Sequence, residues 1–226
     1  MTEQERDLRA RLVAAGVELL AEGGVQALGL REIARRAGVS HGAPRRYFPT
    51  HRELLAAIAR QGFGRLTDTL AGADTLAAGT GADARARLDA LARAYLGFAD
   101  ANPGMFELMF RHDLLEGSGV ELRRTTLPLF QTFVGLVSEV HPRSDDPAAA
   151  TAALWSNLHG LAQLRTWGSL RLITGDESVE PLLRAVLDAH LGPGAAAGQG
   201  ASLGPDARRG QDAPLGPDTR LGPGVR

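Results

Sequence analysis

The sequence predicts an all-α protein of about nine helices, arranged as a small N-terminal domain and a larger helical bundle. Apolar bulk comes mainly from Ala, Leu and Val, and only 5% of the 226 residues are aromatic. Such a composition suits close-packed helices better than a β-sandwich, which favours β-branched and aromatic residues. Helix-capping signals recur along the chain before segments of helical periodicity. No stretch alternates apolar and polar residues for long enough to predict a strand.

The first third of the chain predicts four helices whose starts carry capping residues. Thr2 with Glu5, and Thr50 with Glu53, form capping boxes, and glycines end the first two helices. The predicted helices run from Thr2 to Gly23, from Gly29 to Gly38, from Ser40 to about Tyr47, and from Thr50 to about Leu70. A loop rich in Ala, Gly and Thr is predicted over 71–82.

The middle of the chain predicts five further helical segments, over 83–101, 103–110, 118–140, 147–172 and 178–191. Asn102-Pro103 and Asp146-Pro147 each combine a capping residue with Pro at the first helical position. Pro128 should kink or restart the helix in which it lies.

The last 34 residues differ in composition from the rest of the chain. A Leu-Gly-Pro unit recurs three times, and the segment has too little apolar surface to offset the entropy of ordering. We therefore expect three parts: a domain over 1–50, a helical body over 51–192 and a disordered Gly/Pro-rich tail over 193–226.

Composition excludes several classes of protein and of site. The absence of Cys excludes disulfides and thiolate metal sites, and no two of the six His have the i, i+4 spacing of a metal site. The chain has neither a Gly-rich phosphate loop nor a recognisable nucleophile elbow. We therefore expect no metal, no cofactor, no catalytic residue and no enzymatic activity. Without a long apolar run or a signal peptide, a cytoplasmic protein with no membrane partner is expected.

The charges are unevenly distributed along the chain. Residues 1–65 hold 11 Arg against 7 acidic residues, whereas residues 66–192 hold 10 Arg against 16 acidic residues. A basic first quarter joined to an acidic body indicates that only the N-terminal end meets a polyanion.

Residues 30–48 have the proportions of a helix-turn-helix, with two short helices joined by a tight turn. Gly38 supplies backbone freedom in the turn, and Val39 fills the angle between the helices. The second helix, over 40–47, is too polar for a core helix, and its outward side chains are of types that reach phosphates and base edges. The pattern predicts binding to double-stranded DNA.

The string from Leu30 to Ser40, followed by Tyr47-Phe48 and Glu53-Leu54-Leu55, resembles the N-terminal domain of the TetR/AcrR family of bacterial transcriptional regulators. The resemblance covers residues 8–55 directly. It implies binding to operator DNA through the helix-turn-helix. The DNA-binding residues expected from this motif are Arg31, Ser40, His41, Gly42, Arg45, Arg46, Tyr47 and His51.

The C-terminal half is similar to the members of that family whose body is called a WHG domain. The similarity rests on Ser40-His41-x-Ala43-Pro44, on the segment from Pro103 to Phe110, and on Trp155-(x)3-His159-Gly160. It implies a body that dimerises and binds a small-molecule effector. The density of large apolar residues in the middle helices suggests that this effector is apolar or aromatic. The expected effector-binding residues are Tyr95, Phe98, Phe106, Phe110, Trp155 and His159.

Trp155 and His159 have two interpretations, because they lie four residues apart on one helix face. They could line a ligand cavity, with Trp155 as an apolar platform and His159 as the polar orienting group. They could equally be a core Trp with a hydrogen-bonded His beside it.

The prediction is a homodimeric, ligand-responsive repressor that binds a palindromic operator, with 147–172 and 178–191 as the dimer interface. The alternative is a helical small-molecule-binding or enzymatic protein that has lost operator binding. That alternative is supported by Pro44, which would remove a backbone hydrogen bond from a recognition helix that begins at Ser40, and by the lack of a Thr cap at Gly29.

Overall fold

The computed structural model describes residues 3–118, 122–175 and 178–194. The chain divides into two units after Pro193. The tail predicted over 193–226 lies outside the described residues except for its first two positions, as does Thr2 of the first capping box.

The described residues form eleven α-helices and one short 3-10 helix, and contain no strand, which confirms the all-α prediction. The N-terminal elements are α1 (Glu3–Gly23), η1 (Val25–Ala27), α2 (Leu30–Arg36), α3 (Pro44–Tyr47) and α4 (His51–Gly79). The remaining elements are α5 (Ala84–Ala101), α6 (Pro103–Phe110), α7 (His112–Leu115), α8 (Leu122–Val140), α9 (Pro147–Thr166), α10 (Ser169–Thr174) and α11 (Glu180–Leu191).

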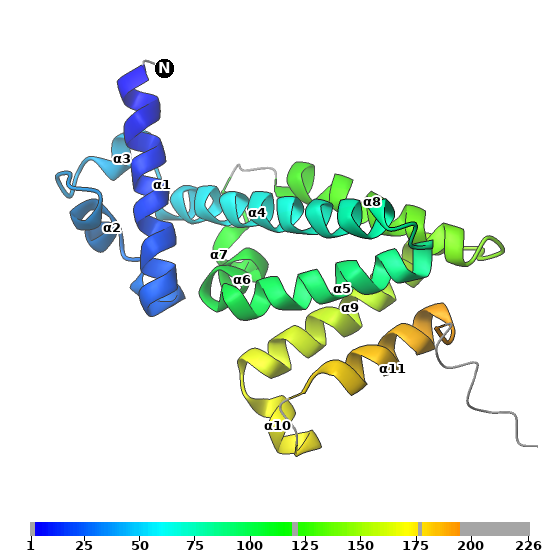
Figure 1. The fold of residues 1–226 in the computed structure, drawn as a ribbon. Coiled ribbons are helices and arrows are strands. Elements are labelled where there is room, and N and C mark those ends of the chain that lie inside the picture. The colour runs from blue at the N-terminus through cyan, green and yellow to red at the C-terminus, as the bar shows by residue number, and fades with distance from the viewer. Residues whose placement is uncertain (1–2, 119–121, 176–177, 195–226) are drawn as a thin grey trace, which may run out of the picture. The chain divides into compact units, whose positions relative to one another are not determined.

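Helix α4 joins the first three helices to the body (Figure 1). Its first turns pack against α1, and further along it packs against α5, α6 and α8. One continuous core results, because the same helix contributes fully buried Leu54 and Ile58 near α1 and buried Leu66 and Leu70 within the body. Helices α9 and α11 pack together on the far side of α5 (Figure 1).

Several predicted caps are present as hydrogen bonds. The Thr50 hydroxyl accepts from the backbone N–H of Glu53 at 3.1 Å, and Asp146 accepts from Ala149 at 2.9 Å. Asn102 behaves differently from the prediction, because its side chain donates to the Phe98 carbonyl at the end of α5 and does not cap α6.

Two predicted boundaries are wrong. The loop expected over 71–82 is mostly helical, since α4 continues to Gly79; this stretch is rich in Ala, and Asp74 forms a bidentate ion pair with Arg87 of α5. The helix expected over 147–172 ends at Thr166, because Gly168 adopts a left-handed conformation with φ of 70° and α10 then starts.

Within the described residues, no helix combines the length and apolar character needed to cross a bilayer. The same residues contain no group of three or more His, Cys, Asp or Glu side chains that could hold a metal ion.

Candidate nucleic-acid interface and ligand cavity

The turn after α2 is fixed by backbone hydrogen bonds. Gly38 has φ of 67°, its N–H donates to the Arg35 carbonyl, and the Val39 N–H donates to the Ala34 carbonyl. These bonds make a Schellman motif, which requires a residue that tolerates positive φ at the position of Gly38. The predicted turn is therefore present, with Val39 packed against the core.

Three arginines connect α1 to the helix-turn-helix. Arg9 donates to the Tyr47 carbonyl at 3.0 Å and lies over the Phe48 ring, and Arg11 donates to the Ala37 carbonyl at 2.7 Å. Arg36 binds Glu22 of α1 through both terminal nitrogens, and this contact lowers the pKa of the Glu22 carboxyl. These arginines hold the three helices together and are not free to contact a nucleic acid.

The second helix of the motif starts later than predicted. Helix α3 begins at Pro44, and residues 40–43 form a turn closed by a hydrogen bond from the Ala43 N–H to the Ser40 carbonyl. Because Pro44 occupies the first helical turn, its missing N–H leaves no backbone bond unmade. The prediction that Ser40 caps this helix is wrong for that reason.

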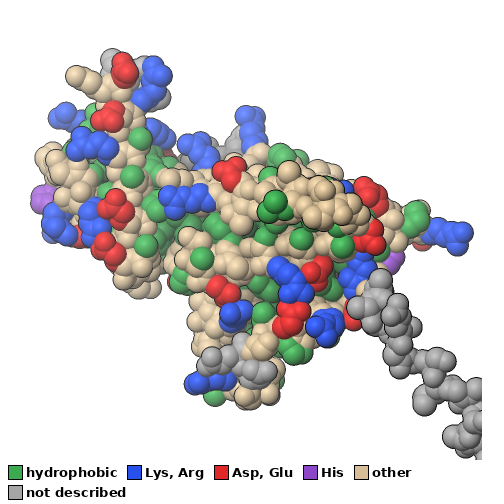
Figure 2. Space-filling model, in the orientation of Figure 1, with side chains coloured by type: hydrophobic (Ala, Val, Ile, Leu, Met, Phe, Trp, Pro, Cys, Tyr) green, Lys and Arg blue, Asp and Glu red, His purple; other side chains and the backbone are tan. Residues whose placement is uncertain are grey.

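Arg31, Arg45 and Arg46 are exposed cations on the helix-turn-helix. No residue that the structure describes forms a hydrogen bond or ion pair with any of their three guanidinium groups. Neighbouring Arg35, by contrast, binds Glu32 of its own helix. Figure 2 shows several Arg side chains over α1 to α3. The fold thus leaves these three guanidinium groups available to phosphates and base edges.

The other predicted DNA-binding residues lie on the same loop and helix. Ser40, His41 and Gly42 are exposed in the turn before α3, and Tyr47 is half-buried at its end. A Cβ added at Gly42 would meet no atom within 4 Å, and Gly42 has no positive φ. Since nothing in the fold requires glycine there, its small size suits the close approach of another molecule.

His51 has a structural contact that the sequence did not reveal. Its Nε2 lies 2.6 Å from the Leu28 carbonyl, so the half-buried ring connects the first turn of α4 to the segment before α2. With Nε2 donating to that carbonyl, only Nδ1 is left for another partner.

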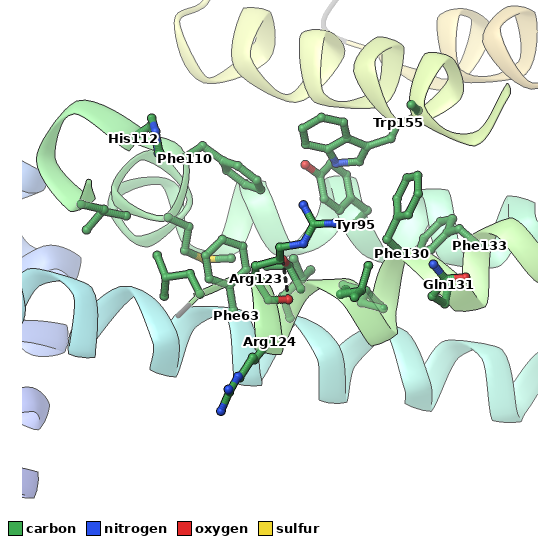
Figure 3. Close-up of a pocket in the computed structure, with 18 of the residues that line it drawn as sticks. Phe63, Tyr95, Phe110, His112, Arg123, Arg124, Phe130, Gln131, Phe133 and Trp155 are labelled. Carbon is green, nitrogen blue, oxygen red and sulfur yellow. Dashed lines mark hydrogen bonds between the residues drawn. The ribbon is translucent and has the colours of Figure 1, made fainter. Parts of the chain in front are cut away.

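A cavity of about 1450 Å³ lies in the body between α4, α5, α6, α8 and α9 (Figure 3). It is larger than the usual range for a small-molecule site. Aromatic side chains form much of its wall, namely Phe63, Tyr95, Phe110, Phe130, Phe133 and Trp155. Of the predicted effector-binding residues, the structure therefore brings Tyr95, Phe110 and Trp155 to the cavity.

Tyr95 is the centre of a polar network at the cavity wall. Its hydroxyl donates to Nδ1 of His159 at 2.9 Å, which fits a neutral ring, because burial lowers the pKa of His159. Burial also raises the pKa of the Tyr95 phenol, and a hydrogen bond from the Trp155 indole N–H opposes part of that rise. Of the two residues Trp155 and His159, only Trp155, which is 39% exposed, lines the cavity.

Phe98 and Phe106 do not reach the cavity. Both are buried, and Phe106 is 1% exposed and packs edge-on against Tyr95 and Phe110. Phe106 therefore supports the wall from behind. Sequence reasoning missed Phe63 of α4 and the two phenylalanines of α8, Phe130 and Phe133, because only the packing of α4 and α8 on α5 brings them together.

Comparison with known families gives two matches. Residues 12–58 match the profile "Bacterial regulatory proteins, tetR family", and residues 88–190 match the profile "Tetracyclin repressor-like, C-terminal domain". The chain belongs to the TetR family. It is a DNA-binding transcriptional regulator with a ligand-binding domain. A search of curated proteins gives no match.

Solved structures include TetR-like folds at several levels of identity. A protein with unknown function from Rhodococcus sp. RHA1 is 31% identical, with a TM-score of 0.68 over 81% of this chain and 93% of the other. The fatty acid degradation regulator FadR from Bacillus halodurans is 19% identical, with a TM-score of 0.59 over 81% and 97%. RolR in complex with resorcinol is 24% identical, with a TM-score of 0.56 over 86% and 92%. The last two show the fold alone.

In this TetR-family chain, two contacts connect the region of the cavity to α1 and α4, the helices on either side of the helix-turn-helix. Arg52, in the first turn of α4, donates to the carbonyl of Glu116 at 2.6 Å, and Glu116 lies on the cavity rim. Gly104 of α6 lies so close to α1 that an added Cβ would be 2.6 Å from the Leu20 carbonyl oxygen. Helix α6 and Glu116 are therefore in direct contact with α1 and α4.

Proposed function

We propose that the protein is a ligand-released repressor that binds an inverted-repeat operator as a homodimer. The observation that carries the proposal is that some N-terminal arginines are bound within the fold while others are exposed. Arg9, Arg11 and Arg36 are used within the fold, whereas Arg31, Arg45 and Arg46 are exposed without a partner among the described residues. A surface with three unpaired cations on the helix-turn-helix is suited to the phosphates and guanine edges of the major groove.

The position of Pro44 in the structure does not support the alternative that the protein has lost operator binding. The alternative function rested on a proline inside the recognition helix, but Pro44 is the first residue of α3 and is buried. The geometry therefore supports a regulator over a helical enzyme, and we propose no catalytic role for the chain.

Dimerisation is proposed because α3 has a single turn and can make few base contacts on its own. A twofold dimer doubles those contacts on a palindrome. Large apolar side chains that are exposed at the end of α9 and on α10, namely Trp167, Leu172 and Ile173, support a partner surface in this region.

Release by a small molecule is proposed from the cavity and its connections. The aromatic wall suits an apolar or aromatic effector, and the structure of RolR with resorcinol shows that a protein of this fold binds an aromatic ligand. An effector that prefers a displaced α6 would move α1 through Gly104 and change the spacing of the two recognition helices.

Selection from a random duplex library tests this function. The purified protein should enrich a motif of two inverted half-sites, and the Arg45→Ala/Arg46→Ala variant should enrich none. The charge-matched variant Arg65→Ala/Arg143→Ala, altered in the body at exposed positions outside the predicted dimer interface, should recover the same motif as the wild type. Enrichment of no motif, or of a single half-site, would contradict operator binding by a dimer.

A further inference from the structure

The cavity holds a cation that the aromatic wall does not explain. Arg123, in the first turn of α8, lines the cavity, and Figure 3 shows its guanidinium among the aromatic side chains. No residue in the described part of the chain forms a hydrogen bond or an ion pair with this guanidinium. The adjacent Arg124 has an interaction partner, and its guanidinium points away from these rings (Figure 3).

The other charged groups at the cavity do not neutralise Arg123. The acidic side chain among the lining residues is Glu116, whose carboxylate lies 3.9 Å from His112 on the rim and is mostly exposed. The hydroxyls of Tyr95 and Thr151 are already hydrogen-bonded, to His159 and to the Pro147 carbonyl. Arg123 is itself exposed, so its guanidinium is accessible to an anion that enters the cavity and can bind that anion in a bidentate manner.

The cavity is also elongated. Its wall on α8 runs from Leu122 to Phe133, which corresponds to about 16 Å along the helix axis. On α4 the lining residues extend from Phe63 to Leu70. A single-ring ligand would fill only part of this length, whereas an extended apolar chain would contact most of the aromatic side chains.

We propose that the effector is an elongated apolar monocarboxylic acid whose carboxylate binds Arg123 and whose chain lies along α8 toward Phe133. The inference rests on the proposed function, since it names the ligand class of the same site. Each buried methylene strengthens binding about fourfold. The carboxylate fixes the orientation of the ligand and selects acids over neutral molecules of the same length.

Binding of dodecanoate, measured by quenching of Trp155 fluorescence in a Trp167→Phe background, tests the proposal. Dodecanoate should bind at least about tenfold more tightly than dodecanol, the factor expected for one charge-assisted hydrogen-bonded pair. Benzoate should bind more weakly than dodecanoate, because it fills a fraction of the cavity. Equal affinity for dodecanoate and dodecanol would overturn the assignment of an acid.

Variants distinguish a specific contact with Arg123 from a general effect of positive charge near the cavity. Arg123→Ala should weaken dodecanoate binding about tenfold or more and leave dodecanol binding unchanged, while Arg124→Ala should change neither. Arg123→Glu should reverse the preference, so that dodecylamine binds more tightly than dodecanoate. Equal losses in the Arg123→Ala and Arg124→Ala variants would show a diffuse charge effect and would refute the specific contact.

The two proposals fail in different ways in these experiments. A protein that prefers dodecanoate through Arg123 but enriches no DNA motif would retain the ligand assignment and lose the repressor function. A protein that enriches an inverted repeat but binds acid and alcohol equally would retain the repressor function and lose the ligand assignment.

Discussion

Replacement of Gly104 by Ala tests the close contact between α6 and α1. An added Cβ would lie 2.6 Å from the Leu20 carbonyl oxygen and 3.2 Å from the Gly24 Cα. Ordinary Cβ contacts begin at 3.4 Å, so relief of the closest contact requires a separation of 3.4 minus 2.6, or 0.8 Å. Because the opposing atoms belong to the backbone, no side-chain rotation can provide that space.

The expected cost of the substitution follows from this geometry. Overpacking of a close contact costs about 1–3 kcal/mol, and a clash with backbone belongs at the upper end. In a protein of this size, about 3 kcal/mol corresponds to a fall in Tm of about 6–12 °C. Gly97 of α5 is the matched control, since a Cβ there meets nothing within 4 Å and the helix interior favours Ala by up to about 1 kcal/mol.

Thermal unfolding followed by circular dichroism measures both variants. Gly104→Ala should lower Tm and Gly97→Ala should raise it, although the chemical change is the same. Below its melting temperature, the Gly104→Ala variant should also bind the selected DNA more weakly than Gly97→Ala, because α1 is displaced. A rise in Tm for both variants would refute the close contact and the route from cavity to DNA that depends on it.

Three further predictions concern the cavity and its connections. In a denaturant titration, Trp155→Ala should lower the free energy of unfolding by about 2–3 kcal/mol, which is less than for a fully buried Trp because the side chain is 39% exposed. A loss of about 5 kcal/mol would show instead that Trp155 is a core residue. Burial lowers the pKa of His159 below 6.5, so the stability that its neutral ring contributes is complete above pH 6.5 and is lost as pH falls through the folded-state pKa. His159→Gln should therefore flatten the fall in Tm that the wild type shows between pH 7 and pH 5, and an identical slope in both proteins would contradict this. In fluorescence anisotropy, Arg52→Ala should leave DNA affinity within about threefold of the wild type but reduce the effect of dodecanoate on that affinity several-fold, as expected for a change in coupling of about 0.5–2 kcal/mol. An undiminished effect of dodecanoate would show that the contact between Arg52 and Glu116 does not couple the two sites.

Local chemistry made much of the fold predictable. The caps at Thr50 and Asp146 and the turn at Gly38 depend on residues within a few positions of each other, and each is found in the structure. The start of α3 was harder to predict, because Ser40 and Pro44 both suit a helix start and the chain uses the second of them.

Contacts between distant parts of the chain were not predictable from the sequence. The cavity wall combines Phe63 with Phe130 and Phe133, and His51 binds the Leu28 carbonyl across 23 residues. Neither follows from periodicity, which identifies the buried face of a helix but not the helix that it meets. The same limit explains why Phe106 was expected at a ligand when it supports the wall from behind.

Equilibrium binding of the selected duplex, followed by fluorescence anisotropy over a range of salt concentrations, tests operator recognition through the exposed arginines most directly. The wild type should bind saturably and resist competitor DNA, with an affinity that falls steeply as salt increases. Arg45→Ala/Arg46→Ala should lose at least about 1–3 kcal/mol of binding free energy and show a shallower salt dependence, while Arg65→Ala/Arg143→Ala should match the wild type. Equal affinity and equal salt dependence in all three proteins would contradict the assignment of α3 as the DNA-reading element.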